Sequence, residues 1–147
     1  MPYDTRELLA RLLQCEAGGE GINGMMAVAT VIMNRANALT GEFARVSNGG
    51  DVRNIILQHS QFTCLLEFVD GVYNPQNIYN MNPQEEHFAI ADWALQGGRF
   101  PDIGESLFFY SPKGGSCRNY FPTNVGVIYN RIGDHCFYTP TIFYHET

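Results

Sequence analysis

The chain has 147 residues, a net charge of −6 at pH 7, 9 Lys and Arg residues and 45% hydrophobic residues. This length suffices for one domain with a hydrophobic core, so we expect a single domain over residues 1–147. No basic cluster occurs, which argues against a nucleic-acid partner. No apolar run approaches the length of a membrane span, and the polar start does not resemble a signal peptide. We therefore expect a protein made in the cytosol, without a membrane span.

Two helices are predicted within the first 36 residues. Asp4, followed by Glu7 three residues later, is expected to cap a helix that ends at about residues 15–17. Asn23 is expected to cap a second helix that continues to residue 36. Because residues 25–33 are apolar on nearly every side, this second helix should be central and buried.

The middle of the chain is predicted to contain two long loops around a short helix. Residues 37–50 end in Ser-Asn-Gly-Gly and indicate a surface loop. Asp51 should then cap a helix that runs to about residue 59. Residues 70–82 are rich in Asn, Gly, Pro and Tyr, which is typical of a loop.

The remaining elements set the predicted fold class. Asn82 is expected to cap a helix that ends at Gly97-Gly98. Short aromatic and β-branched runs then predict strands at 107–110, 126–129 and 135–138. Helices followed by strands indicate an α+β domain dominated by helices, with a small β-rich C-terminal half and a cleft between the halves.

Glu16 occupies a position where an apolar residue is expected. With Leu9, Leu12 and Leu13 it follows the i, i+3, i+4, i+7 pattern of one buried helix face. A carboxylate there must be paired, be protonated, or line a cleft. Burial should raise its pKa, which would allow it to act as a general acid. The alternative is a helix-terminal glutamate that reaches solvent or pairs with Arg11 or Arg35.

Two further polar residues are candidates for the same site. Glu20 is interpreted as a second acid, as a group that orients the substrate, or as a charge that favours the start of the second helix. His135 stands beside Asp134 at the start of a predicted strand. Its imidazole could bind substrate or orient a carboxylate, and a structural histidine is an equal alternative.

Aromatic and amide side chains are the candidates for contacts with a sugar. Six aromatic residues could stack on sugar faces: Phe62, Phe108, Phe109, Tyr110, Tyr120 and Tyr138. Most aromatic residues in strands belong to the core, and the alternation of side chains allows only half of them to face a cleft, so Phe62 and Tyr110 are the preferred candidates. Gln61 precedes Phe62 and can supply hydrogen bonds, and Ser111 follows Tyr110 at the predicted end of a strand.

The four cysteines, at positions 15, 64, 117 and 136, form no CxxC pair and match no zinc spacing. Buried free thiols are the expectation, with disulfides between distant pairs left open. A thiol hydrolase using Cys15 or Cys117 with His135 is a weaker hypothesis, since the Glu16 carboxylate should raise the pKa of the Cys15 thiol. No histidine has the spacing of a metal ligand, so we expect neither a metal nor another cofactor.

Five segments occur in a recognisable order along nearly the whole chain. They are Cys15–Glu20, Val31–Arg35, Gln61–Thr63, Phe109–Pro112 and Ile132–Phe137. In this order they resemble the SleB/CwlJ family of cell wall hydrolases, best known from lysis of the spore cortex. The chain is more similar to the CwlJ type, because only the catalytic domain is present. Two positions depart from the family pattern: Gly18 replaces a frequent arginine, and Cys15 replaces a frequent alanine.

The resemblance implies a lysozyme-like α+β fold and cleavage of peptidoglycan glycan strands, with Glu16 as the catalytic acid/base. SleB-type members are lytic transglycosylases, in which one carboxyl serves both steps of cleavage between muramic acid and N-acetylglucosamine. The resemblance also implies spore cortex as the substrate, a role in germination, and synthesis in the mother cell. It further implies a location at the boundary of the spore coat and the outer cortex, with a coat protein as partner. A non-catalytic spore-coat or peptidoglycan-binding protein on the same fold is the alternative.

Overall fold

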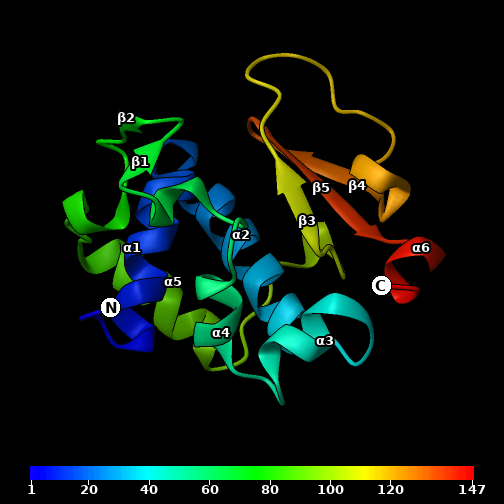
Figure 1. Cartoon of the computed structure of the whole chain (residues 1–147), viewed down its shortest axis with the longest axis horizontal. Coiled ribbons are helices and arrows are strands. Elements are labelled where there is room, and N and C mark those ends of the chain that lie inside the picture. Colours follow the sequence, from blue (N-terminus) through cyan, green and yellow to red (C-terminus); the bar gives the residue numbers. More distant parts are fainter.

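The computed structural model describes all 147 residues. The helices are α1 (Thr5–Ala17), α2 (Gly21–Ala36), α3 (Gly41–Ser47), α4 (Val52–Leu57), α5 (Glu85–Leu95) and α6 (Ile142–His145). The strands are β1 (Phe68–Val69), β2 (Val72–Tyr73), β3 (Phe108–Tyr110), β4 (Gly126–Ile132) and β5 (His135–Pro140). Figure 1 shows α1, α4 and α5 on one side of α2 and the strands β3, β4 and β5 on the other. The α+β prediction, with helices first and the main sheet last, is confirmed.

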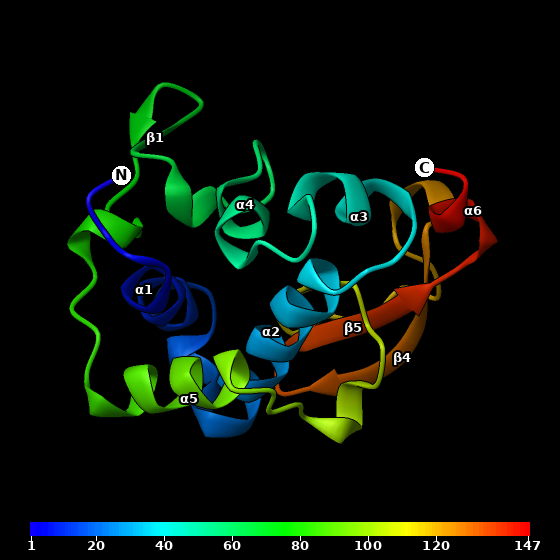
Figure 2. The ribbon, with the colours of Figure 1, turned by 90° about the horizontal axis from the view of Figure 1, so that it is seen from below.

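Helix α2 is the centre of the fold. Figures 1 and 2 both place it between the pair α1 and α5 and the three-stranded sheet. Its side chains from Ala27 to Ile32 are fully buried, as its uniform apolar character predicts. Each large aliphatic side chain buried in this way contributes about 1.5–3 kcal/mol, so α2 holds the two halves of the molecule together. The helix begins at Gly21, two residues before the predicted cap at Asn23.

Helix α1 forms because local signals and burial agree. The Asp4 side chain accepts a hydrogen bond of 2.8 Å from the Glu7 backbone N–H, which confirms the predicted cap. Leu9, Leu12 and Leu13 are fully buried on one face of the helix. The α-helix ends at Ala17, and a 3₁₀ turn over Gly18–Glu20 connects it directly to α2. This short connection places the end of α1 beside the start of α2.

The main sheet is antiparallel, with the strand order β3-β5-β4. Its central strand β5 is the most buried, and Cys136, Phe137 and Tyr138 are inaccessible to solvent. Strand β4 contains a bulge between Ile128 and Asn130. Tight packing also explains Gly126 at the start of β4, where an added Cβ would lie 2.9 Å from the Tyr138 Cβ.

Two disulfides correct the expectation of buried free thiols. Cys15 is bonded to Cys64 and Cys117 to Cys136, so the chain has no free cysteine. The first disulfide joins α1 to the 3₁₀ turn at Thr63–Leu65, and the second joins the loop after β3 to β5.

Three segments differ from the predicted loops and caps. Residues 37–50 contain α3, because Phe43 is buried against Phe108 and Tyr144. The predicted loop at 70–82 includes part of a β1–β2 hairpin and a 3₁₀ turn. Helix α5 is capped by Gln84 and not by Asn82, because the Gln84 backbone N–H donates to the His87 ring while the Gln84 side chain accepts from the His87 backbone.

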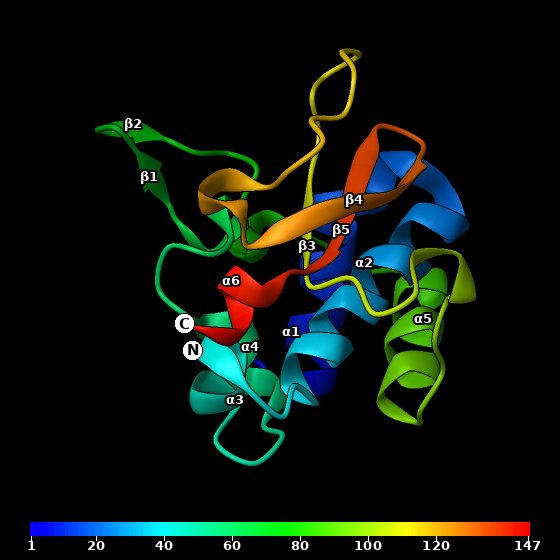
Figure 3. The same cartoon turned by 90° about the vertical axis from the view of Figure 1, so that its right-hand side faces the viewer.

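The main sheet and the helices each carry a projection. In Figures 1 and 3 the β1–β2 hairpin extends from the helical side, and the loop after β3 extends from the sheet side. None of the helices combines the length and the apolar character that a membrane crossing would need.

Candidate active site

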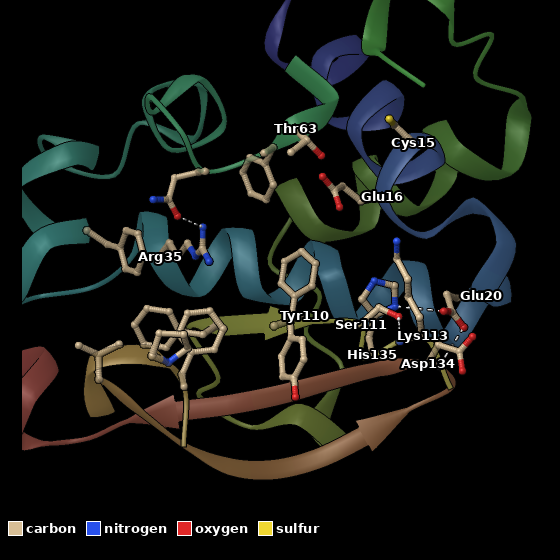
Figure 4. Close-up of a pocket in the computed structure, with 18 of the residues that line it drawn as sticks. Cys15, Glu16, Glu20, Arg35, Thr63, Tyr110, Ser111, Lys113, Asp134 and His135 are labelled. Carbon is tan, nitrogen blue, oxygen red and sulfur yellow. Dashed lines mark hydrogen bonds and ion pairs between the residues drawn. The ribbon is translucent and has the colours of Figure 1, made fainter. Parts of the chain in front are cut away.

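A cavity of about 910 Å³ lies between the helices and the main sheet. This volume is in the range of sites that bind small molecules or segments of polymers. All seven residues that the sequence analysis singled out line it: Glu16, Glu20, Gln61, Phe62, Tyr110, Ser111 and His135. Figure 4 shows Glu16 at the end of α1 on one wall and His135 with Ser111 near the sheet on the other. Residues far apart in the sequence therefore meet in one cavity.

Glu16 lies in the last turn of α1 with its carboxyl group directed into the cavity (Figure 4). The side chain is half-buried, and the rest of the protein offers its carboxyl neither a hydrogen bond nor an ion pair. Burial raises the pKa of Glu16 to about 7, and the positive charge of Arg35 only partly opposes this effect. A large fraction of Glu16 is therefore protonated at neutral pH, as a general acid requires.

Neither predicted arginine partner pairs with Glu16. The Arg11 guanidinium instead donates to Glu7 at 2.8 Å and to the carbonyls of Ile78 and Met81. Arg35 donates to the Leu107 carbonyl at 2.7 Å and to Gln61 Oε1 at 3.1 Å. The carboxyl group of Glu16 is left for the cavity.

Glu20 lies close to the turn between β4 and β5. Its Oε1 is 3.2 Å from His135 Nδ1, and its Oε2 accepts a hydrogen bond of 3.2 Å from the Asp134 backbone N–H. Its side chain does not cap α2. Glu20 therefore holds the sheet against the turn that follows α1, whereas Glu16 has no such partner.

His135 is buried beside Glu20 and packs against the ring of Phe109 at 5.5 Å between ring centroids. Burial lowers the pKa of His135, although the nearby carboxylate of Glu20 acts in the opposite direction. A lowered pKa keeps the imidazole neutral at neutral pH, so it can donate or accept a hydrogen bond without adding a charge to the cavity.

Gly133 makes the contact between Glu20 and the β4–β5 turn sterically feasible. It has φ of 58°, and a Cβ at this position would collide with Glu20 Oε2. We expect Gly133→Ala to lower the free energy of unfolding by about 1–3 kcal/mol, through backbone strain and displacement of Glu20. Urea denaturation measures this change.

Gly114 provides the matched control for that substitution. It also has positive φ, at 87°, but an added Cβ would meet nothing within 4 Å. Gly114→Ala should therefore lower the free energy of unfolding through backbone strain alone. Equal losses for the two variants would contradict the role given to the Gly133–Glu20 contact.

A family model described as Cell Wall Hydrolase matches residues 19–138, which is most of the chain. The chain belongs to the cell wall hydrolase family. The match begins at Gly19, so it includes Glu20 and His135 but not Glu16. The assignment of Glu16 therefore rests on its geometry in the cavity and on the sequence motif that contains it.

Curated relatives and solved structures agree with this family. The cell wall hydrolase CwlJ of Oceanobacillus iheyensis is 30% identical over 137 residues, covering 92% of this chain and 86% of the relative. CwlJ of Bacillus subtilis is 29% identical, covering 92% and 84%. The fold is similar to the catalytic domain of the germination-specific lytic transglycosylase SleB from Bacillus anthracis, with a TM-score of 0.64 at 21% identity over 94% of this chain and 98% of that chain. The catalytic domain of SleB from Bacillus cereus gives a TM-score of 0.62 at 23% identity, covering 92% and 89%.

These findings confirm the predicted SleB/CwlJ family and the prediction that this chain is an enzyme. The thiol hydrolase hypothesis is wrong for this structure, because Cys15 and Cys117 are both in disulfides and have no thiolate to act as a nucleophile. The hydrolase also contains no group of three or more His, Cys, Asp or Glu side chains that could hold a metal ion.

Two lining residues outside the seven principal candidates, Phe109 and Arg35, also make contacts that shape the cavity. Phe109 contacts Phe62, His135 and Phe137, whereas its neighbour Tyr110 stacks on Tyr138. The alternation of side chains along β3 turns these two residues to opposite faces of the sheet, and both still line the cavity. The second residue, Arg35, lies at the polar end of the apolar helix α2.

Proposed function

We propose that this hydrolase cleaves the glycan strands of peptidoglycan, with Glu16 as the general acid and base. The observation that carries the proposal is the isolated carboxyl of Glu16, whose pKa is raised to about 7 within the large cavity. Membership of the cell wall hydrolase family supports the substrate class. The similarity in fold to a protein described as a lytic transglycosylase agrees with glycan cleavage.

The reaction we propose is a transglycosylation between muramic acid and N-acetylglucosamine. Protonated Glu16 donates its proton to the glycosidic oxygen, and the bond from that oxygen to C1 of muramic acid breaks. The Glu16 carboxylate then takes the proton of the muramic 6-hydroxyl, whose oxygen bonds to C1 and closes a 1,6-anhydro ring. Glu16 is reprotonated, and no water is consumed. One carboxyl therefore suffices for both proton transfers.

The other carboxylates of the cavity favour this single-acid scheme. Glu20 contacts His135 and the Asp134 backbone, and Glu42 accepts a hydrogen bond of 3.1 Å from Gln58. Asp134 is exposed and lies 3.7 Å from Arg131. Each has a partner in the protein, whereas a second catalytic carboxylate would have to face the substrate. We assign Glu20 a positioning role, and Gln61, Phe62, Tyr110, Ser111 and His135 to substrate binding.

The biological setting belongs to the same proposal. We infer spore cortex as the substrate, action during germination, and a location at the boundary of the spore coat and the cortex, with a coat protein as partner. Relatives named CwlJ and a structural neighbour described as germination-specific support this setting. The two disulfides support a final location outside a reducing cytosol, where such bonds are rare.

The pH dependence of cleavage tests the protonation state of Glu16. The first step needs the protonated carboxyl, so the rate at low substrate concentration should fall about tenfold per pH unit above pH 7. Release of soluble muropeptides from purified sacculi between pH 5 and 9 measures this profile, with protein stability checked at each pH. A rate that stays constant from pH 6 to 9 would contradict the assignment.

A further inference from the structure

The guanidinium of Arg35 is a buried cation without an ionic partner. Arg35 is only 4% exposed to solvent, yet its guanidinium takes part in no ion pair. It is enclosed by aromatic rings, with its Cζ atom 4.5 Å from the ring centroid of Phe43 and 5.6 Å from that of Phe62. Burial of a cation lowers the stability of the folded protein unless its N–H groups donate hydrogen bonds.

Only part of the hydrogen-bonding capacity of Arg35 is used within the protein. Nε donates to the Leu107 carbonyl and Nη1 to Gln61 Oε1, whereas Nη2 has no partner. Nη2 is accessible to solvent, and Arg35 lines the cavity that contains Glu16. The free N–H groups of Arg35 therefore face the space that the substrate would occupy (Figure 4).

Arg35 fixes the orientation of the Gln61 amide. A guanidinium only donates hydrogen bonds, so Gln61 must present its oxygen to Arg35, as the structure has it. The amide nitrogen of Gln61 must then point the other way. It has no partner in the protein, and Gln61 also lines the cavity. Arg35 and Gln61 together offer neighbouring N–H donors, and the one acceptor of the pair, Gln61 Oε1, already bonds to Arg35.

From this geometry we infer that Arg35 and Gln61 form a subsite for a carbonyl or carboxylate oxygen carried by a sugar ring. The inference rests on the proposed function, because it names the part of the glycan that this end of the cavity binds. Peptidoglycan offers two such groups, the acetamido carbonyl and the lactyl carboxyl of muramic acid. Each presents oxygen acceptors to which a cationic fork and an amide N–H donate well. The arrangement also explains why a positive charge is kept in the cavity although it lowers the pKa of the catalytic acid.

The test measures binding in a catalytically inactive background, so that cleavage does not consume the ligand. Glu16→Gln is combined with Gln61→Glu, which keeps an acceptor for Arg35 but removes the amide donor and neutralises the cation. Gln96→Glu introduces the same charge on the exposed end of α5 and is the matched control. Calorimetry then gives Kd for three ligands: peptide-free glycan strands, the same strands with reduced lactyl carboxyls, and a chitin oligosaccharide.

Gln61→Glu should raise the Kd of peptide-free strands by about 10- to 100-fold, and Gln96→Glu should leave it unchanged. If Gln61→Glu also weakens binding of the chitin oligosaccharide, the group bound is the acetamido group. If Gln61→Glu no longer weakens binding once the lactyl carboxyls are reduced, the group bound is the lactyl carboxyl. If Arg35 has a purely structural role, Gln61→Glu should leave the Kd unchanged, because the glutamate still accepts a hydrogen bond from Arg35. That result would overturn the subsite. If Glu16→Gln alone binds no glycan, the proposed function fails as well.

A second measurement uses the protein with Arg35 and Gln61 intact. The side-chain nitrogen signals of Arg35 should shift by NMR when peptide-free strands are added to Glu16→Gln. Arg11 provides the internal control, because its guanidinium is likewise stacked on an aromatic ring, that of Tyr3, but the residue is half-buried and lies outside the cavity. Equal shifts for the two arginines, or none for either, would argue against the subsite.

Discussion

Glu16→Gln should reduce the release of muropeptides by at least about 10³-fold, because the proposed reaction uses this one carboxyl as both acid and base. Glutamine has nearly the same shape and cannot transfer the proton. The fold should be retained, since no protein group donates to or pairs with the Glu16 carboxyl. Assays of sacculus digestion, with circular dichroism as the check on folding, measure both properties. Digestion by Glu16→Gln at the native rate would contradict the assignment.

The same substitution should stabilise the protein at high pH. The pKa of Glu16 is about 7 in the folded protein against an ordinary value of 4.5 for a glutamate side chain, so the folded state binds the proton more tightly. Stability therefore falls as pH rises from about 4.5 to 7, by on the order of 3 kcal/mol in total. Glu16→Gln removes the loss of stability that ionisation of Glu16 causes, so the variant should be more stable than the native protein at pH 8. The difference in stability should narrow towards pH 4.

Urea denaturation at pH 4 and pH 8 measures this pattern, with Glu67→Gln as the control on an exposed glutamate. A gain in stability together with a loss of activity is expected when a group is kept for catalysis in a site that does not stabilise it. A pH-independent difference between Glu16→Gln and the native protein would show that burial does not raise the Glu16 pKa.

Removal of the Cys15–Cys64 disulfide should have the largest effect on stability. The bond spans 49 residues of sequence, and a loop of this length corresponds to about 4 kcal/mol of stabilisation in the chain-entropy account. Cys15 immediately precedes Glu16, and Cys64 follows the cavity residues Gln61 and Phe62. The double variant Cys15→Ala/Cys64→Ala should therefore lose activity as well as stability, even at temperatures where it remains folded.

The second disulfide provides the comparison. Cys117–Cys136 spans 19 residues, so its removal should lower stability by about 3 kcal/mol. Neither of its cysteines lines the cavity, so activity per folded molecule should fall less. Thermal denaturation and sacculus digestion of both double variants test the distinction. Native stability in the Cys15→Ala/Cys64→Ala variant would contradict the role of the first disulfide.

Local signals in the sequence were sufficient for some elements of the fold. The caps at Asp4 and Asp51 are formed by side chains that bond backbone groups three residues away, so short windows of sequence contain them. Helix α3 was missed because it depends on the burial of Phe43 against Tyr144, about a hundred residues later in the chain. The disulfides stay an open alternative at the level of sequence for the same reason, since sequence spacing does not fix the distance between cysteines.

The candidate site shows the same division. The position of Glu16 could be predicted from helix periodicity, because an acid on a leucine face is unusual within a single turn of helix. The contact between Glu20 and the turn at Gly133–His135 joins residues more than a hundred positions apart, so only the folded chain reveals it. The sequence suggested Arg35 only as an ion-pair partner of Glu16, because its actual partners, Gln61 and Leu107, come from separate segments of the chain.

Mass spectrometry of the fragments released from purified spore sacculi tests the central claim most directly. The account predicts new glycan ends with 1,6-anhydromuramic acid from the native protein, and none from Glu16→Gln. Release of peptides with new free amines and no new glycan ends would contradict glycan cleavage. Reducing muramic or glucosamine ends would instead contradict the transglycosylase reaction that we propose for Glu16.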